Sequence, residues 1–419
     1  MKTAAVIAEF NPLHNGHEYF LNEIRRRSEC DYLVCVMSGD FVQRGEPAIL
    51  DKYERTRLAL RAGCDLVLEL PVRYSTGSAP VFAGGAVSIL NSLGCIDELW
   101  FGSESGDIND FEELSTAFAD ESSDLYALIR EFIRKGNSYP KSRAMAVNRL
   151  YGSRFDQLLS EPNNILGLEY CTALKKVDSR VRPHCLKRAG QGYNDSSSTD
   201  SAEFPSAASI RNIIRTDAAS VPEPRFTDAA LSLPEPVRTP ISGIPAYVRY
   251  AMEKNRGAKL FLNDLSGLLC YKLLCENAET LVQYDDVTPD LAKRIVSVCR
   301  PGLSFTSQIE ALKVKNITYS HISRALLHIL LNLKGNTPPL FDPSYIRILG
   351  MKDCGDLLHK IKTSGNKNLL TAKPSSLKTE AGDPYADDLF ASNLYEAIKC
   401  ERSGHEFIHE YSKPSPVKL

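Results

Sequence analysis

Short apolar runs alternate with helical patterns along the first two hundred residues, and this alternation constrains the fold more than any other feature of the chain. Residues 18–27, 52–62, 78–93, 111–119 and 124–134 carry apolar side chains at helical spacing. Apolar strands separated by helices form a parallel sheet that is covered on both faces and connected by right-handed crossovers. The sequence therefore predicts an α/β fold, with strands at residues 4–8, 32–37, 66–70, 98–101 and, later, 180–186.

A change of composition marks the end of this pattern. Residues 193–209 are rich in Ser, Asp and Ala, as in a solvated loop, and the Pro-rich residues 221–236 are typical of a domain boundary. A short helix is expected between them at 209–215. We expect a parallel-sheet domain over residues 1–218 and a mainly α-helical domain over residues 219–419, with helices at 247–253, 265–276, 288–299, 304–313 and 319–333.

Composition narrows the class of protein. A chain of 419 residues is long enough for two or three domains, and 43% hydrophobic with 24% charged residues is typical of a soluble globular protein. The net charge of −2 excludes a global polycation, so any RNA contact must come from a local patch. We expect no membrane association, because no apolar run has the length of a membrane span. The eleven cysteines are scattered without a Cys-x-x-Cys pair, which favours reduced thiols in the cytoplasm.

The first predicted strand is followed by a His-x-Gly-His sequence, from His14 to His17, that opens the first predicted helix. A helix start offers unpaired backbone N–H groups and the positive end of the helix dipole, and Gly16 lets a phosphate approach the backbone. The two imidazoles can donate hydrogen bonds to a leaving pyrophosphate and, when protonated, neutralise its charge. This arrangement predicts adenylation, in which a nucleophile attacks the α-phosphate of ATP.

Other polar residues follow predicted strands or begin predicted helices, where α/β proteins bind ligands. Asp40, Gln43 and Arg44 follow the second strand and are candidates to orient a substrate or the triphosphate, with the alternative of a solvated crossover loop. Gly102 can pass close under a ribose or adenine. Further candidates are the helix start at 161–167, Lys187-Arg188, and the hydroxyl and arginine groups of 206–211.

These sequences together resemble the bacterial tRNA(Met) cytidine acetate ligase family, within the His-x-Gly-His nucleotidyltransferase superfamily. The resemblance covers most of the chain and includes residues 9–17, 37–48, 65–71, 101–104, 139–140, 162–167, 187–188 and 317–332. It implies a Rossmann-like nucleotidyltransferase domain followed by the helical domain. It also implies a two-step reaction, in which acetate and ATP form acetyl-adenylate and the acetyl group passes to N4 of the wobble cytidine of elongator tRNA(Met).

The resemblance also assigns roles to residues. From the residues themselves, His14, His17 and Asp40 form the expected catalytic set, although the family usually has Asn where Asp40 stands. Mg²⁺ is plausible as a partner of the pyrophosphate, although the sequence has no dedicated carboxylate cluster for it. The expected nucleotide-binding residues are Ile7, Ala8, Glu9, Phe10, Asn11, Pro12, Leu13, His14, Asn15, Gly16, His17, Glu18, Tyr19, Phe20, Gly102, Asn163 and Arg188.

A basic region in the second half is the candidate RNA-binding surface. The candidate residues are Lys313, Lys315 and Arg324, close to Tyr319. The residues alone also fit a solvated charged helix face, and the family resemblance favours RNA.

One motif near the end of the chain points elsewhere. Residues 405–409 match His-Glu-x-x-His, the zinc-protease helix motif. We expect no structural zinc there, because the ten residues that follow contain no third histidine, and an amphipathic helix explains the pattern.

Two further functions stay open at this point. One is a small-molecule adenylyltransferase of the same superfamily, and the other is a non-catalytic nucleotide- or RNA-binding protein. Acetate-dependent exchange of pyrophosphate into ATP separates them from the ligase.

Overall fold

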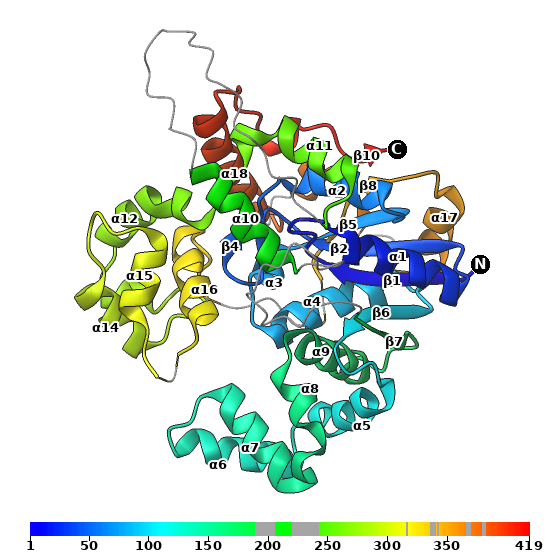
Figure 1. Cartoon of the computed structure of the whole chain (residues 1–419), viewed down its shortest axis with the longest axis horizontal. Coiled ribbons are helices and arrows are strands. Elements are labelled where there is room, and N and C mark those ends of the chain that lie inside the picture. Colours follow the sequence, from blue (N-terminus) through cyan, green and yellow to red (C-terminus); the bar gives the residue numbers. More distant parts are fainter. Residues whose placement is uncertain are drawn as a thin grey trace.

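The computed structural model describes residues 1–188, 206–219, 243–315, 317–335, 341, 343–365, 370–378 and 383–419. A single eight-stranded sheet lies at its centre, with the order β10-β8-β5-β2-β1-β6-β7 and with β9 paired to β8 (Figure 1). The predicted parallel α/β sheet is confirmed by five mutually parallel strands: β1 (Thr3–Ala8), β2 (Tyr32–Ser38), β5 (Leu66–Leu70), β6 (Glu98–Ser103) and β7 (Arg182–Lys187).

Side chains of these strands alternate between two hydrophobic cores, one on each face of the sheet. Ala5 and Leu68 belong to the core under α4, α5 and α9, whereas Ala4 and Val67 belong to the core under α1 and α2. Both faces are buried, which is why the strands are continuously apolar. The helices concerned are α1 (Asn15–Ser28), α2 (Lys52–Arg61), α4 (Ala79–Ser92), α5 (Ile108–Ala119) and α9 (Pro162–Lys176).

Several shorter strands and helices also belong to this domain. A two-stranded hairpin, β3–β4, and the short helix α3 follow β2 and β5. Helices α6 and α7 extend as a lobe below the sheet in Figure 1. The bounds are β3 (Phe41–Val42), β4 (Glu46–Pro47), α3 (Val72–Ser75), α6 (Asp124–Arg134), α7 (Tyr139–Tyr151), η1 (Gly152–Phe155) and α8 (Asp156–Ser160).

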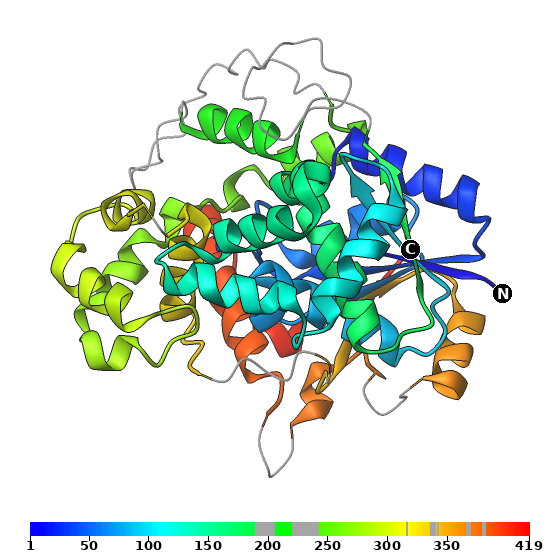
Figure 2. The same ribbon diagram turned by 90° about the horizontal axis from the view of Figure 1, so that it is seen from below.

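A helical unit with its own core lies beside the sheet domain, at the left of Figures 1 and 2. Its helices occur where the sequence predicts them, because each buries one apolar stripe against the others. It contains η3 (Leu262–Leu265), α12 (Ser266–Leu274), α13 (Ala278–Leu281), α14 (Pro289–Val298), α15 (Phe305–Leu312) and α16 (Tyr319–Leu330). Before it come α10 (Ala207–Ala219), α11 (Ala246–Lys254) and η2 (Arg256–Ala258).

The last part of the chain differs from the prediction of a helical unit that reaches residue 419, because it returns to the sheet. Strand β8 (Ile346–Met351) pairs antiparallel with β5, and β9 (Leu370–Thr371) and β10 (Val417–Lys418) pair with β8. The remaining elements are α17 (Gly355–Ser364), η4 (Pro374–Leu377), α18 (Ala386–Ser403) and η5 (Glu410–Ser412). The predicted loop at 193–209 lies largely, and the Pro-rich boundary at 221–236 entirely, outside the described residues.

A buried charge network holds this returning segment. The Arg347 Nη1 lies 3.1 Å from Glu69 Oε2 and 2.6 Å from Glu410 Oε1, and Lys52 Nζ lies 2.6 Å from Glu69 Oε1 and 2.7 Å from Glu410 Oε1. All four side chains are almost completely buried. Burial lowers the pKa of Lys52, but the carboxylates of Glu410 and Glu69 outweigh it and raise that pKa above its ordinary value. The pairing of β8 with β5 joins residues that lie almost three hundred positions apart, so this return depends on contacts between distant residues.

Among the described residues, none of the helices has the length and apolar character that crossing a bilayer requires.

Candidate active site

A pocket of about 700 Å³ opens at the carboxyl ends of β1 and β6. Strands β2 and β5 extend the sheet on one side of β1, and β6 and β7 extend it on the other. This reversal of strand order is where open α/β sheets bind ligands. The pocket combines both parts of the molecule, because its lining includes β1, β6, α9 and α10 as well as the start of α16 from the helical unit.

The His-x-Gly-His sequence forms a reciprocal cap at the start of α1. The Gly16 backbone N–H donates to His14 Nδ1 at 3.1 Å, and the His14 backbone N–H donates to His17 Nδ1 at 3.3 Å. The two imidazole rings stack with centroids 3.8 Å apart, and the ring of Phe10 packs edge-on against His17. The local sequence therefore makes both histidines part of the helix start.

These caps determine the protonation of the two rings. A ring nitrogen that accepts a backbone N–H carries no proton, so the neutral tautomer places the hydrogen on Nε2 of both His14 and His17. Burial, followed by the charges of Arg188 and Arg211, lowers the pKa of His14 to about 3. Burial, followed by His14 and Arg188, also lowers the pKa of His17 well below its ordinary value. In the structure the imidazoles are therefore neutral hydrogen-bond donors, which differs from the predicted option of protonated rings.

Positive charge in the pocket comes from other groups. Five cationic side chains line it: Arg44, Lys187, Arg188, Arg211 and Arg324. Four helices also begin at its wall, and the lining residues at their starts are Gly16 and His17 of α1, Pro162 and Asn163 of α9, Ser206 and Ala207 at α10, and Thr318 and Tyr319 at α16. Helix N-termini and arginines both favour phosphate oxygens, so the pocket is suited to a polyphosphate.

Contacts with backbone carbonyls hold Arg211 and the β3–β4 hairpin in place at the pocket. Arg211 Nη1 donates to the Asn11 carbonyl at 3.0 Å, which connects α10 to the loop after β1. The hairpin β3–β4 docks on α16, where Ser323 Oγ donates to the Gly45 carbonyl at 2.9 Å. Gly45 has φ 75°, and a Cβ there would lie 2.5 Å from the Arg324 backbone nitrogen, so the close approach requires glycine.

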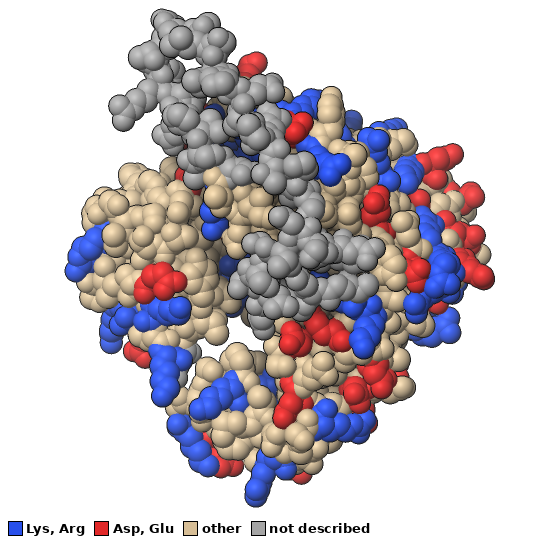
Figure 3. Space-filling view, in the orientation of Figure 1, with Lys and Arg blue, Asp and Glu red and all other residues tan. Residues whose placement is uncertain are grey.

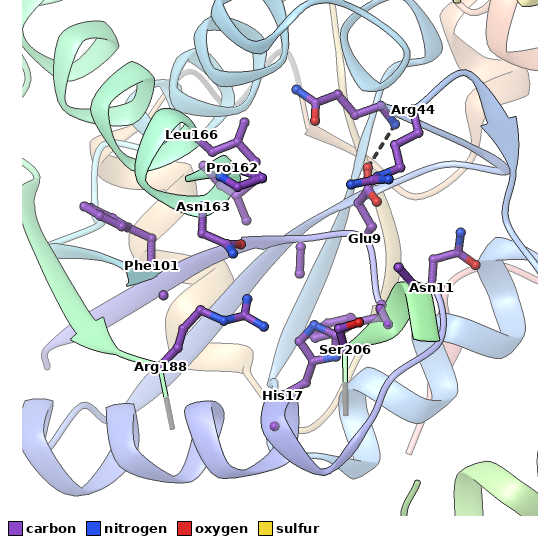
Figure 4. A pocket seen from close by; sticks show the side chains of 18 of the residues that line it. Glu9, Asn11, His17, Arg44, Phe101, Pro162, Asn163, Leu166, Arg188 and Ser206 are labelled. Atoms are coloured by element: carbon purple, nitrogen blue, oxygen red, sulfur yellow. Dashed lines mark hydrogen bonds between the residues drawn. The ribbon is translucent and has the colours of Figure 1, made fainter. Parts of the chain in front are cut away.

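The opposite wall of the pocket, formed by β6 and α9, has apolar and amide groups (Figure 4). Phe101, Asn163 and Leu166 lie there, with Arg188 pointing into the same space. Asn164 Oδ1 accepts from Ser103 Oγ at 2.8 Å and from the Glu104 backbone N–H at 2.9 Å, so it ties the start of α9 to the end of β6. This wall can hold a flat base beside the phosphate-binding groups.

Most predicted nucleotide-binding residues line this pocket. They are Ile7, Ala8, Glu9, Phe10, Asn11, His14, Gly16, His17, Tyr19, Phe20, Gly102, Asn163 and Arg188. Four others do not: Pro12, Leu13, Asn15 and Glu18. Leu13 is fully buried in the core under α1, and the Glu18 carboxylate accepts from Tyr247 at 3.2 Å. The sequence alone cannot show which predicted residues line the pocket and which do not, because successive residues of a loop point in different directions.

Asp40, a member of the predicted catalytic set, lies outside the pocket. Its side chain is buried outside the pocket lining, and its Oδ1 accepts the Lys52 backbone N–H at 2.8 Å at the start of α2. This hydrogen bond is a structural contact, and the predicted catalytic role of Asp40 stays a prediction. Sequence reasoning missed Arg55, whose buried guanidinium donates to the carbonyls of Glu9, Ser38 and Gly39 and so fixes two site loops together.

The candidate RNA-binding residues separate into two places. Lys313 and Lys315 are exposed between α15 and α16. Arg324 instead lines the pocket and pairs with Asp286 at 2.9 Å. Sequence reasoning did not place α16 at the pocket, because nothing local to residues 318–324 indicates which surface they face.

The His-Glu-x-x-His residues are not on a helix, which corrects the expected amphipathic helix. Helix α18 ends at Ser403, and residues 404–409 form no helix or strand. Both ring nitrogens of His409 are engaged, Nδ1 by the Tyr411 backbone N–H and Nε2 by the Asn393 side chain. The two histidines therefore lack the one-turn spacing on a helix that the zinc motif requires.

Comparison with known proteins agrees with this geometry. The family model described as HIGH Nucleotidyl Transferase matches residues 1–407. The tRNA(Met) cytidine acetate ligase of Thermoanaerobacter sp. (strain X514) is 34% identical over 99% of this chain and 100% of its own length. The protein of the same name from Caldanaerobacter subterraneus is 36% identical over 94% of this chain and 95% of its own.

Two solved structures are also similar to this chain over its whole length. Thermotoga maritima TmcAL bound with alpha-thio ATP has a TM-score of 0.84 at 29% identity, and its apo form has 0.86 at 30%, each covering 100% of both chains. From the matched family and these relatives, the chain belongs to the HIGH nucleotidyl transferase family, in its tRNA(Met) cytidine acetate ligase group.

Proposed function

We propose that this protein is an ATP-dependent ligase that activates acetate as acetyl-adenylate and transfers the acetyl group to N4 of the wobble cytidine of elongator tRNA(Met). One observation carries the proposal: the paired Nε2–H donors of His14 and His17 stand in a pocket lined by five cationic side chains and four helix starts. The relatives named tRNA(Met) cytidine acetate ligase supply the substrates.

In the first step, an acetate oxygen attacks the α-phosphorus of ATP and pyrophosphate leaves. Neutral imidazoles that donate through Nε2 contribute hydrogen bonds to the phosphate oxygens as these gain charge, without a proton transfer. Arg188 and Arg211 supply the positive charge that the imidazoles lack. Catalysis of this step is then mainly positioning and charge stabilisation.

In the second step, the tRNA must present its cytidine to the same pocket. Basic side chains lie on the helical unit and on the α6–α7 lobe, on either side of a notch (Figure 3). We assign Lys313 and Lys315 to tRNA phosphates, since both are exposed on the helical unit. Arg324 is better placed to act inside the pocket.

Two supporting assignments complete the proposal. Glu9 is the one acidic residue among the described residues that line the pocket, so Mg²⁺ would be held mainly by phosphate oxygens, which it often binds. The eleven cysteines are free thiols, which supports a cytoplasmic enzyme together with a tRNA substrate.

The test is exchange of labelled pyrophosphate into ATP with and without acetate. Acetate-dependent exchange supports the ligase, exchange driven by another small acceptor supports a small-molecule adenylyltransferase, and no exchange supports a binding protein. Mass analysis of tRNA(Met) from a deletion strain is the matching test in cells, where loss of N4-acetylcytidine is expected.

A further inference from the structure

Glu9 is the carboxylate among the described groups at the site, and the charges of Arg211 and Arg44 act on it. It is the one acid among the described pocket-lining residues, which otherwise include five cations. A lone carboxylate does not help to bind ATP, whose phosphates it repels. Its carboxylate oxygens are suited to accept hydrogen bonds from a ligand group with N–H donors.

Glu9 occupies a defined side of the pocket (Figure 4). Phe101, Asn163 and Arg188 lie on the β6–α9 side, whereas Glu9 lies with Arg44 on the side of the β3–β4 hairpin. His17, at the start of α1, lies below the space between the two groups in this view. A nucleotide whose base lies on the β6–α9 wall and whose phosphates meet His17 leaves the Glu9 side for the second substrate.

The surrounding backbone fixes the Glu9 carboxylate. The Gln43 backbone N–H donates to Glu9 Oε1 at 2.9 Å, and Arg55 Nη1 donates to the Glu9 carbonyl at 2.8 Å. A carboxylate has two oxygens and about four lone-pair positions, so the bond from Gln43 does not exhaust its capacity to accept from a ligand. The group is thus positioned before any substrate arrives.

We infer that the Glu9 carboxylate accepts the exocyclic amine of the target cytosine and takes its proton during acetyl transfer, an inference that rests on the proposed function. Cytosine presents an N4 amine donor where uracil presents a carbonyl oxygen, so a carboxylate accepts the first and repels the second. In the transfer, the amine nitrogen forms a bond to the acetyl carbonyl carbon. The bond from that carbon to the phosphate oxygen breaks, AMP leaves with the electron pair, and the amine proton passes to Glu9.

Burial supports this role. Burial raises the pKa of Glu9 above its ordinary value, although the Gln43 hydrogen bond and the charges of Arg211 and Arg44 partly oppose it. A raised pKa makes the carboxylate a stronger proton acceptor near neutral pH.

The test compares Glu9→Gln with the wild type in two separate assays. One is acetate-dependent pyrophosphate exchange, and the other is single-turnover acetyl transfer to tRNA(Met) across a pH series. We expect transfer to fall at least about a hundredfold more than exchange, with loss of the rise in transfer rate with pH. Glu54→Gln, on the outer side of α2 beside Arg57, is the matched control and should change neither.

Each other outcome has a definite meaning. Equal loss of exchange and transfer would assign Glu9 to adenylate formation and overturn the inference, as would a wild-type transfer rate. A wild-type protein without exchange would instead overturn the proposed function. If Glu9→Gln does not fold, Glu9→Asp keeps the carboxylate, and its transfer should be slowed but keep the rise with pH.

A binding measurement tests the same carboxylate without turnover. The wild type, loaded with acetyl-sulfamoyl-adenosine, should bind tRNA(Met) about tenfold more tightly with cytidine than with uridine at the wobble position. Glu9→Gln should lose this preference, because an amide can donate to uracil O4. An unchanged preference in the variant would contradict the assignment.

Discussion

His14 and His17 cap the same helix start reciprocally: His17 Nδ1 accepts the backbone N–H of His14, while His14 Nδ1 accepts that of Gly16. This relationship leaves Nε2–H of each ring as the donor to a ligand. The cap thus does two things with one pair of side chains, since it starts α1 and prepares two donors for phosphate.

The variant His17→Ala should reduce the rate of acetate-dependent exchange by on the order of a hundredfold, because it removes a donor to the charge that develops on the phosphates. It also removes one cap bond, so its free energy of unfolding should fall by about 1 kcal/mol. Exchange kinetics and urea unfolding measure the two effects. Exchange at the wild-type rate would remove His17 from the reaction.

The pH dependence of stability tests whether His14 is neutral. Its folded pKa of about 3 lies below the ordinary value of 6.5, so the unfolded chain binds a proton that the folded protein excludes. The contribution of His14 to stability is therefore constant above pH 6.5 and declines as pH falls towards 3, by on the order of 2 kcal/mol at about pH 5. His14→Asn keeps a capping side chain without the titration, so its urea midpoint should depend less on pH between about 5 and 7.5.

Gly102 and Gly167 lie near the wall of the pocket formed by β6 and α9. Their substitution by alanine should have different effects. A Cβ on Gly102 would meet the Arg188 side chain at 3.5 Å, an ordinary contact, so Gly102→Ala should leave stability unchanged. It should raise KM for ATP about tenfold, because the methyl group occupies space next to the nucleotide. Steady-state kinetics at varied ATP measures this, and an unchanged KM would remove Gly102 from the nucleotide site.

Gly167 is the second of the two glycines, and it packs against the ring of Phe101 in the core. A Cβ there would lie 2.4 Å from the Phe101 ring, so Gly167→Ala should lower the free energy of unfolding by about 1–3 kcal/mol. Urea unfolding is the measurement, and a wild-type midpoint would show that α9 can shift away from β6.

The buried network predicts that the returning C-terminal segment depends on Arg347. Arg347→Met removes the buried cation that pairs with both Glu69 and Glu410 and leaves Lys52 as the one described cation paired with both carboxylates, so stability should fall by about 3 kcal/mol or more. Urea unfolding measures the loss. A matched variant at an exposed pair, Arg57→Met beside Glu54, should cost little.

The exposed lysines of the helical unit give a prediction for tRNA binding. Replacing Lys313 and Lys315 with Ala should reduce the slope of log affinity against log salt by about 1 for each lysine. Filter binding of tRNA(Met) across a salt series measures the slope. The double variant Lys362→Ala and Lys373→Ala, at exposed positions outside the helical unit, is the control, and an unchanged slope in the first variant would exclude the patch.

What the sequence determined by itself is local. The strand, loop and helix from Thr3 to Ser28, the parallel sheet, and the helices of the helical unit all follow from periodicity and from turn and cap residues that lie within a few positions of each other. Helix-start chemistry is local too, which is why His14 and His17 could be recognised as a pair.

Only the tertiary structure decided which distant groups meet. It brought Arg211 and the start of α16 to the pocket, placed Asp40 outside the pocket at the start of α2, and returned Arg347 to the sheet. Each of these depends on contacts between residues far apart in the chain. Such contacts produce no periodic pattern in the sequence. The free energy that favours them comes from burial and charge pairing, which exist only in the folded protein.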